Sequence, residues 1–435
     1  MKYMDIVKEL INGKFIDPDG GGETTLSVPT RSVVIADSLA GREADVVAAL
    51  DLEPPFAVVS DPDTHAAMGH RVEHSISSLG RVIKVTLGKN PHADMHTAEA
   101  LMTETWNAGT LIAVGSGTIN DLCKYAAARQ GRGCAVFATA PSMNGYTSVN
   151  AAITDHGHKK SLPALAPDGV FMDLEVLAAA PKRMIQSGLG DSICRATAQV
   201  DWLFSHLLFD SEYREAPFQL LADDEKNLLA NPEALVSGDL DAMGRLARTL
   251  VLSGIGMTVC GGSYPASQGE HLISHYIEMM HPADWPEAFH GEQIAVTACV
   301  MARLQEQVLS GPVPRVSPTA VTRQSVLTHF GDEVGAACWD EFDRKRLSET
   351  DAERLNARID QSWFEIREKL MEHLIPADTM VAILKRAGAP FHFNGINLDK
   401  RFFLDAIYHA REIRNRYTFL DLAADAGMMN PENLV

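Results

Sequence analysis

The chain has 435 residues, which is longer than one small hydrophobic core supports, so the length predicts two domains. Hydrophobic residues make up 46% and charged residues 22%, an ordinary composition for a globular protein. The formal net charge of -19 would repel nucleic-acid phosphates, so we expect no nucleic-acid partner. A small anionic substrate is still compatible with this charge, because local fields can oppose the global one.

The cysteines and the start of the chain indicate a compartment. No CxxC pair occurs, and the opening MKYMDIVKEL has no signal-peptide character. No apolar run reaches the roughly 18 residues that suggest a membrane span. We therefore expect a cytoplasmic protein with reduced thiols and no membrane insertion. The six cysteines are Cys123, Cys134, Cys194, Cys260, Cys299 and Cys338.

The first part of the chain alternates short apolar runs with helix-like segments. This alternation predicts a largely parallel, Rossmann-like sheet with helices on both faces, and hence an α/β domain. The expected elements are a strand and turn at 31–41, a strand, acidic turn and helix at 56–69, a strand at 81–88, a strand, glycine turn and helix at 110–131, and a buried strand at 134–141.

From about Leu177 onward, apolar residues recur at helical spacing and few β-branched runs interrupt them. Residues 221–236 and 343–374 are amphipathic, with charge on the outer face. We place a boundary near Pro181, which gives an α/β dinucleotide-binding domain at 1–181 and an all-helical metal- and substrate-binding domain at 182–435. A ligand cleft is expected between the two.

A glycine turn, AVGSGTIND, follows one predicted strand and opens a helix. Gly115 and Gly117 would let the backbone approach a ligand without an intervening Cβ, and the free N–H groups of the helix start would favour an anion. The turn could therefore hold a pyrophosphate. It lacks the full GxGxxG fingerprint, with Asp121 where the third glycine would stand, and many tight turns carry two glycines without binding anything.

Two further polar segments follow predicted strands. Asp61, after FAVVS, could accept hydrogen bonds from adenosine ribose hydroxyls and repel a 2′-phosphate, or could simply begin a turn with Pro62. The loop ATAPSMNGYTS could contact a cofactor through Thr139, Ser142 and Ser148, or could only build the turn.

A histidine-rich stretch runs from Gly269 to Gly291. His271 and His275 lie one helical turn apart on one face, and His290 precedes a glycine. Imidazole nitrogens with a carboxylate oxygen suit zinc, iron or nickel, and Asp191 in SGLGDSICRATA is the candidate carboxylate. The alternative for Asp191 is a helix N-cap. A metal with an open position would lower the pKa of an alcohol, and a nicotinamide would take its hydride.

Six motifs occur in one order: VVSD, GSGTIND, TAPSMNGYTS, GLGD, GEHLISH and HG. This order resembles the polyol dehydrogenases related to iron-containing alcohol dehydrogenase. Within that superfamily it most resembles the sn-glycerol-1-phosphate dehydrogenases. The segment AREIRNRYTFLDLAADAG, near the end of the chain, is also similar to theirs. The resemblance runs from about Phe56 to Gly427 and implies the dehydroquinate synthase-like fold. The related dehydroquinate synthases usually have glutamate as the first ligand, where this chain has Asp191, which favours a dehydrogenase.

The resemblance also implies a site. Asp191, His271 and His290 would bind one divalent ion (zinc, nickel or iron). His275 would not be a ligand but would lie beside the ion, contact substrate and relay a proton. Asp191 and Asn144 would also contact substrate. The expected NAD(P)H contacts are Asp61, Gly115, Ser116, Gly117, Thr118, Ile119, Asn120, Asp121, Thr139, Ala140, Pro141, Ser142 and Ser148, with Asp61 favouring NADH.

Three residues depart from the glycerol-1-phosphate dehydrogenase pattern. Asn144 stands where that group usually has aspartate, Tyr264 where it has arginine, and Gln268 where it has a small residue. The loss of an arginine removes a bidentate phosphate partner. The remaining candidates for holding an anion, each of which could equally be a solvated surface charge, are Lys159, Lys160 and Arg195.

The leading hypothesis is a metal-dependent NAD(P)H oxidoreductase that interconverts a small polyol, or its phosphate, and the corresponding ketone. The first pair to test is sn-glycerol 1-phosphate and dihydroxyacetone phosphate. The alternatives are a dehydroquinate synthase-like cyclase or lyase that uses NAD transiently, and a catalytically silent NAD-binding descendant. We expect a small-molecule substrate and a homo-oligomer.

Overall fold

The computed structural model describes residues 5–155 and 158–435, which divide into two compact units. The described part of the first unit lies within 1–192 and 214–263, and the second unit is 193–213 with 264–435. These units differ from the predicted ranges 1–181 and 182–435. The reason is that helix α13 (Leu240–Val259) packs against strand β3 (Ser32–Ala36) and helix α7 (Leu174–Ala179), which keeps residues 214–263 with the sheet.

The first unit is built on a six-stranded sheet in the order β3-β10-β7-β6-β4-β5, in which every pair is parallel. The predicted parallel sheet is therefore confirmed. Strand β10, a central strand of five residues, was not predicted from the sequence. The bounds are β3 Ser32–Ala36, β4 Phe56–Ser60, β5 Val82–Thr86, β6 Thr110–Gly115, β7 Gly133–Ala138 and β10 Gly169–Asp173.

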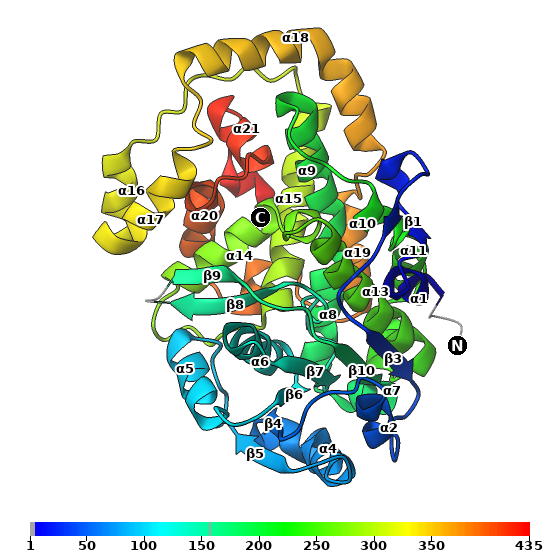
Figure 1. Ribbon diagram of the computed structural model, residues 1–435. Coiled ribbons are helices and arrows are strands. Elements are labelled where there is room, and N and C mark those ends of the chain that lie inside the picture. The colour runs from blue at the N-terminus through cyan, green and yellow to red at the C-terminus, as the bar shows by residue number, and fades with distance from the viewer. Residues whose placement is uncertain (1–4, 156–157) are drawn as a thin grey trace. The chain divides into compact units, whose positions relative to one another are not determined.

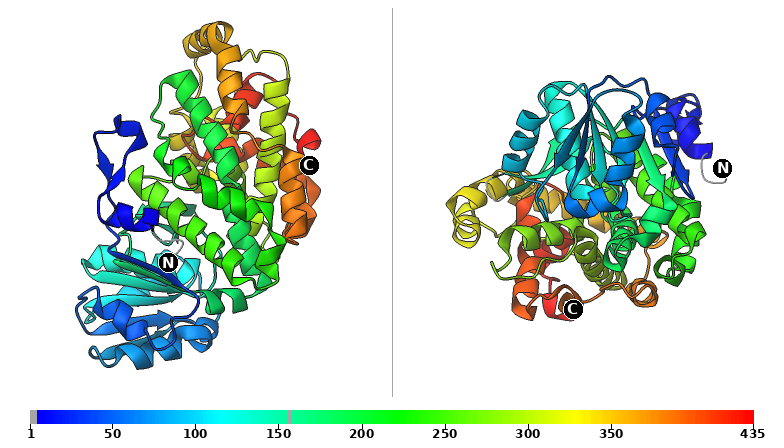
Figure 2. Two further views of the ribbon diagram at one scale, coloured as in Figure 1. Left: turned by 90° about the vertical axis from the view of Figure 1, so that its right-hand side faces the viewer. Right: turned by 90° about the horizontal axis from the view of Figure 1, so that it is seen from below.

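Helices lie on both faces of this sheet (Figures 1 and 2). On one face, side chains such as Ile112 and Val114 of β6 form a core cluster with Val47 of α2 and Val72 of α4. Helix α6 packs against β6 and β7, and α5 packs against α6. The helix bounds are α1 Asp5–Ile11, α2 Glu43–Ala48, α3 Pro62–Thr64, α4 His70–Ile76, α5 Met95–Glu104, α6 Gly117–Gln130, α7 Leu174–Ala179, α8 Lys182–Ile193, α10 Ala216–Gln219, α11 Ala222–Ala230, α12 Glu233–Val236 and α13 Leu240–Val259.

Two small antiparallel pairs complete the first unit: β1 (Phe15–Ile16) with β2 (Thr25–Leu26), and β8 (Asn150–Asp155) with β9 (His158–Pro163). The sheet order creates a switch point, because the chain passes from β4 to β5 on one side and returns to β6 on the other. Loops after neighbouring strands diverge at such a point, and ligands of open α/β sheets bind there.

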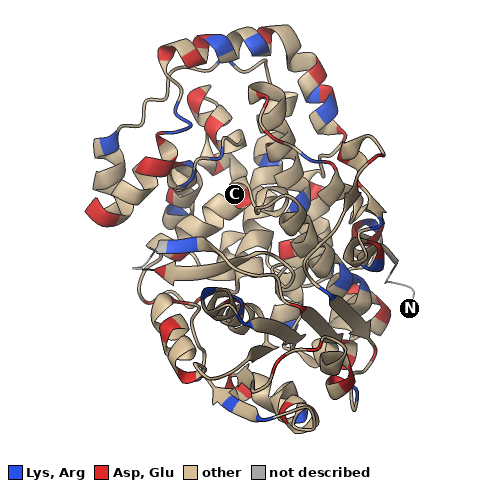
Figure 3. Ribbon diagram, in the orientation of Figure 1, with Lys and Arg blue, Asp and Glu red and all other residues tan. Residues whose placement is uncertain are grey.

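The second unit is helical in its described residues, as predicted. Its core cluster combines apolar side chains from α9, α14, α15, α18 and α20. Helix α18 carries Lys, Arg, Asp and Glu along its length (Figure 3), which confirms the predicted amphipathic segment. The bounds are α9 Arg195–Phe209, α14 Gly269–Met280, α15 His290–Ser310, α16 Arg323–Phe330, α17 Asp332–Phe342, α18 Glu349–Met371, α19 Ala377–Arg386, α20 Lys400–His409 and α21 Phe419–Asp425.

Among the helices of the described residues, none has both the length and the apolarity that crossing a bilayer requires.

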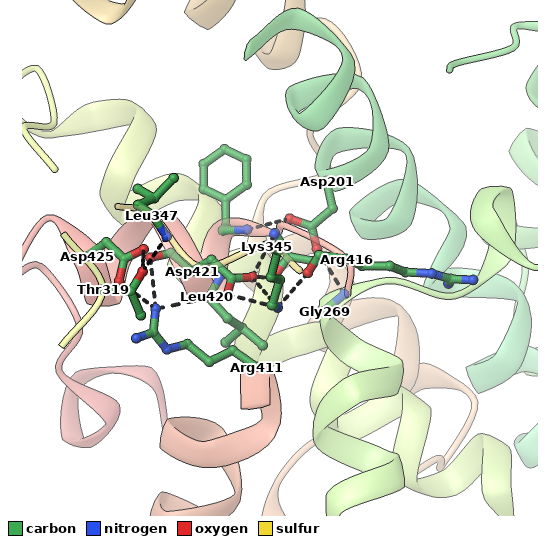
Figure 4. A network of polar contacts seen from close by, with 12 residues as sticks. Asp201, Gly269, Thr319, Lys345, Leu347, Arg411, Arg416, Leu420, Asp421 and Asp425 are labelled. Carbon is green, nitrogen blue, oxygen red and sulfur yellow. Dashed lines mark hydrogen bonds and ion pairs between the residues drawn. The ribbon is translucent and has the colours of Figure 1, made fainter. Parts of the chain in front are cut away.

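A buried polar network anchors the C-terminal segment of the second unit (Figure 4). Lys345 pairs with Asp421 at 2.8 Å, and Arg411 pairs with Asp425 at 2.8 Å. At the other end of the network, Asp201 accepts the N–H of Phe419 at 3.0 Å. These buried charges are tolerated because they are paired. The bond from Phe419 to Asp201 holds the C-terminal segment against helix α9.

Candidate active site

The glycine turn lies at the carboxyl end of β6, beside the switch point. Gly115 has no positive φ; instead, a Cβ there would lie 2.6 Å from Cδ1 of Ile119, so the glycine permits tight packing of α6 on the strand. Ser116 precedes α6 without a side-chain cap bond, and Gly117 and Thr118 are half-buried. The first turn of α6 therefore keeps uncapped N–H groups that can face an anion.

The loop after β7 is bonded to this turn. The Ser116 and Ser142 hydroxyls are hydrogen-bonded to each other, and Tyr146 Oη donates to the carbonyl of Ala140 at 2.6 Å. Burial raises the pKa of the Tyr146 phenol, so it stays protonated as a donor. The structure thus brings together the predicted contacts of residues 115–121 and 139–142 on adjacent strands.

Ser148 and Asp121 make bonds within the protein. The fully buried Lys124 amine donates to Ser148 Oγ at 3.0 Å, and Asp121 accepts the backbone N–H of Ala152 at 3.0 Å. Burial lowers the pKa of Lys124, while Asp121, 3.5 Å away, opposes that shift. These bonds hold β8 against α6, so both residues have a structural role whatever else they contact.

Asp61 follows β4 at the other side of the switch point and caps α3. Its Oδ1 accepts the N–H of Thr64 at 2.8 Å, and its own N–H is bonded to Thr64 Oγ1 at 2.9 Å. The alternative that Asp61 begins a turn with Pro62 is therefore confirmed. Within the residues that the structure describes, no hydrogen bond to Asp61 Oδ2 is seen, so this role leaves one carboxylate oxygen for a ligand.

His271 and His275 lie on α14, whose first turn is held by a buried acid. Asp201 Oδ2 accepts the N–H of Gly269 at 3.0 Å, which satisfies one of the free N–H groups of the helix start. His271 is buried and His275 half-buried, and their ring centroids are 5.9 Å apart. The i, i+4 spacing thus places both imidazoles on one face, as predicted.

His290 is the first residue of α15, which packs against α14. Ser274 Oγ donates to Gln293 Oε1 at 3.0 Å, and Gln293 Nε2 donates to the carbonyl of Ala288 at 3.1 Å, so the loop before His290 is tied to both helices. The His290 ring centroid lies 5.2 Å from that of His271. The two imidazoles therefore face each other across adjoining helices.

Asp191 lies inside α8. The prediction that it stands between a glycine turn and a helix is therefore wrong, and so is the alternative that it caps a helix N-terminus. The glycines before it serve packing: a Cβ on Gly188 would lie 1.7 Å from the carbonyl oxygen of Pro141. Because α8 approaches the loop after β7 so closely, the buried Asp191 Oδ2 accepts the backbone N–H of Asn144 at 2.7 Å. Asn144 is 9% exposed, and its Nδ2 has no hydrogen-bond partner among the described residues.

Two of the three predicted metal ligands, His271 and His290, lie together in the second unit, where their ring centroids are 5.2 Å apart. The third, Asp191, belongs to helix α8 of the first unit, whose last residue, Ile193, begins the second unit. Within the second unit, Cys194, Glu270 and His271 form another candidate metal group, whose ligand atoms lie within 4.8 Å of one another.

Tyr264 and Gln268, two of the residues that depart from the family pattern, lie close together before α14. Gln268 Nε2 donates to the carbonyl of Tyr264 at 2.9 Å. The Tyr264 ring is stacked near Trp202, with centroids 5.9 Å apart, and the Arg416 guanidinium lies 4.5 Å from the Tyr264 ring centroid. Burial lowers the pKa of Arg416 to about 10, so it remains a cation at neutral pH.

The three cationic residues predicted to hold a substrate anion differ in how deeply they are buried. Lys160 pairs with Asp155 at 2.8 Å on a side chain that is 42% exposed, which fits a surface ion pair. Lys159 is half-buried on the same strand. Arg195, by contrast, is buried, and that burial lowers its pKa to about 10.

Sequence reasoning missed three groups around these residues: the buried Glu270 and Asp201 and the half-buried Arg416. Glu270 directly precedes a nominated ligand in the motif GEH, which was a usable signal. Asp201 and Arg416 come from distant segments, and only the fold brings them to the start of α14.

Comparisons with known proteins identify the family. Residues 34–181 match the family model for iron-containing alcohol dehydrogenase. A curated glycerol-1-phosphate dehydrogenase [NAD(P)+] of Thermococcus kodakarensis is 32% identical over 276 residues, covering 63% of this chain and 77% of the relative. The chain belongs to the glycerol-1-phosphate dehydrogenase family. The corresponding enzyme of Bacillus licheniformis is 27% identical over 379 residues, covering 86% of this chain and 83% of the relative.

Solved structures show the same fold at low identity. A probable glycerol dehydrogenase of Sinorhizobium meliloti superposes with a TM-score of 0.61 at 15% identity, covering 93% of this chain and 94% of its own. An iron-containing alcohol dehydrogenase of Thermococcus thioreducens gives 0.61 at 13% identity, with coverages of 94% and 96%. The predicted fold and the predicted class, a metal-dependent NAD(P)-linked dehydrogenase of the glycerol-1-phosphate dehydrogenase family, are confirmed.

Proposed function

We propose that this dehydrogenase interconverts sn-glycerol 1-phosphate and dihydroxyacetone phosphate with NAD(P)H, and that Asp191, His271 and His290 bind the divalent ion it requires. The observation that carries the proposal is the pair of imidazoles, His271 and His290, whose ring centroids lie 5.2 Å apart in the second unit. The curated relatives of Thermococcus kodakarensis and Pyrococcus abyssi are both named glycerol-1-phosphate dehydrogenase [NAD(P)+].

The donor set fits a metal on chemical grounds. One carboxylate and two imidazoles suit zinc, nickel or iron and leave coordination positions open. His271 has its Nδ1 2.9 Å from Glu270, so its Nε2 is the nitrogen available to an ion. When bound, the ion would act as a Lewis acid that lowers the pKa of the substrate hydroxyl or polarises the ketone.

The cofactor assignment is supported by the carboxyl edge of the sheet. The uncapped first turn of α6, after Gly115 and Ser116, offers N–H groups to the pyrophosphate. Asp61 Oδ2, on the far side of the switch point, would accept the ribose hydroxyls, which favours NADH over NADPH. The cofactor would supply the hydride that reduces the ketone carbon.

Asn144 and His275 are proposed to act on the substrate. The unpartnered amide Nδ2 of Asn144, buried beside Asp191, is suited to donate a hydrogen bond to a substrate oxygen. His275 is half-buried one turn from His271, where its ring could pass the hydroxyl proton towards solvent. The buried Arg195 is the favoured cation for the substrate phosphate, since Lys160 is already paired at the surface.

The test measures NADH oxidation with dihydroxyacetone phosphate after the protein is stripped of metal and reloaded separately with zinc, nickel or iron. Metal-dependent oxidation with formation of sn-glycerol 1-phosphate supports the proposal. Absence of turnover with every phosphorylated and free ketose of three to six carbons would contradict it. Product formation without a net change in reduced cofactor would instead indicate a cyclase-type reaction.

A further inference from the structure

Glu270 is fully buried at the start of α14, and hydrogen-bonding partners surround its carboxylate. Oε1 lies 2.9 Å from His271 Nδ1 and accepts the backbone N–H of Gln268 at 2.8 Å. Oε2 accepts the hydroxyl of Thr197 at 3.1 Å. This carboxylate is therefore fixed at both oxygens, and one of its partners is an imidazole that we assign to the metal.

These contacts decide how the His271 ring is protonated. An ionised carboxylate can only accept hydrogen bonds, so the nitrogen facing Glu270 must carry the hydrogen. That leaves the lone pair on Nε2, which is the atom available for an ion. A histidine ligand whose other nitrogen donates to a carboxylate has its ring orientation fixed and its basicity raised.

The second candidate metal group, Cys194 with Glu270 and His271, does not explain these contacts. The Glu270–His271 distance of 2.9 Å is a hydrogen-bond distance, and an ion there would displace the N–H bond from Gln268 to the same oxygen. Cys194 Sγ points to the carbonyl of Ala266 at 3.9 Å. Glu270 is thus better suited to hold the ligand than to be one.

We propose that Glu270 is a positioning residue that holds His271 in the Nδ1–H form and strengthens metal binding through Nε2. This inference rests on the proposed function, because it presumes that His271 is a ligand. Glu270 would act on the ion only through His271 and would contact neither the substrate nor the ion.

Asp201 provides a matched control for a purely structural effect. It is likewise a fully buried carboxylate at the start of α14, and it accepts the N–H groups of Gly269 and Phe419, both at 3.0 Å. It makes no hydrogen bond to His271 among the described residues. A substitution at Asp201 therefore perturbs the same helix end without altering the partner of the imidazole.

The first experiment measures the Co²⁺ affinity of the metal-free protein by equilibrium dialysis, together with the visible absorption of the bound Co²⁺. Glu270→Gln keeps the shape and an acceptor oxygen but loses the charge, so binding should weaken about 10- to 100-fold with a changed Co²⁺ spectrum. Glu270→Ala should bind more weakly still. Asp201→Asn should stay within about threefold of wild type, whatever its stability.

Wild-type affinity and spectrum in Glu270→Gln would overturn the inference while leaving the proposed function intact. Absence of Co²⁺ binding by the wild-type protein would overturn both. Because the variants could fold poorly, a second measurement uses the wild type alone: ¹⁵N-histidine NMR of the metal-free protein, with the His271 signal identified by its loss in His271→Ala. The Nδ1–H tautomer is expected, and the Nε2–H tautomer would contradict the proposal.

Discussion

The carboxyl edge of the sheet and the start of α14 offer different kinds of groups to ligands. At the sheet edge the groups are mainly backbone N–H groups of α6 and the hydroxyls of short loops, such as Ser116 and Ser142. At α14 they are ring nitrogens and carboxylates, and the acids beside them, Glu270 and Asp201, are 0% exposed. The first kind of site depends on the path of the chain, and the second on the protonation and orientation of particular side chains.

This difference determines which substitutions are damaging in each region. A backbone site is lost when an added atom moves the chain, as a Cβ on a closely packed glycine would. A side-chain site is lost when a ligand or its hydrogen-bond partner is truncated.

His271→Ala removes an imidazole of the proposed ligand set. Bound metal and turnover should be lost together, because several kcal/mol of charge stabilisation corresponds to roughly 10³-fold or more in rate. Metal analysis of the purified variant alongside its steady-state rate checks this. Full metal content in the variant would show that the ligand assignment is wrong.

Gly188→Ala places a Cβ where the carbonyl oxygen of Pro141 lies, since the ideal position is 1.7 Å from it. Backbone cannot yield as a flexible side chain can, so we expect destabilisation of about 3 kcal/mol. Gly88→Ala is the matched control, because nothing lies within 4 Å of its Cβ and its φ is not positive. Thermal unfolding midpoints compare the two, and equal midpoints would refute the packing role of Gly188.

His275→Ala should keep the metal and lose mainly rate. A positioned acid–base group contributes roughly 10²- to 10⁴-fold, so a kcat loss of about 10²-fold with unchanged metal content is expected. The measurements are metal content and kcat at saturating ketone. Loss of metal equal to that of His271→Ala would make His275 a ligand.

Asp61→Ser keeps an N-cap oxygen for α3 but removes the negative charge. The ratio of kcat/KM for NADH to that for NADPH should therefore fall by about tenfold without loss of stability. An unchanged ratio, or a wild-type preference for NADPH, would contradict the ribose role.

Asp201 should make stability depend on pH. Burial, reinforced by the charge of Glu270, raises the Asp201 pKa from 3.8 to about 8. The folded state then holds a proton that the unfolded state releases, so this contribution to stability is full below about pH 4 and is lost as pH rises towards 8. In Asp201→Asn, the thermal unfolding midpoint should vary less between pH 5 and 8 than in the wild type. Calorimetry at several pH values measures this. A parallel pH dependence in both proteins would contradict this.

The sheet could be predicted because its strands are continuous apolar runs, such as FAVVS at 56–60 and TLIAVG at 110–115. The strand β10 was missed because its apolar run is only three residues, 170–172, between Gly169 and Asp173, and helix α7 begins directly after it. The grouping of residues 214–263 with the sheet could not be predicted either. Helical periodicity shows that a segment forms a helix, but not which partner the helix packs against.

The placement of His271 and His275 on one side of α14 could be predicted because i and i+4 residues share a helix face. The place of Asp191 could not, because the sequence suggests that Gly188 and Gly190 form a turn, whereas α8 runs through them to approach Pro141. Glu270 was overlooked because adjacent helix residues normally face apart, yet at the first turn it reaches both Gln268 N and His271 Nδ1.

The most direct test is anomalous diffraction from crystals of the zinc-reconstituted protein, collected on both sides of the zinc absorption edge. We expect one zinc peak at bonding distance from an oxygen of Asp191, from Nε2 of His271 and from a ring nitrogen of His290. Zinc held instead by Cys194, Glu270 and His271, or zinc bound without His271, would contradict it.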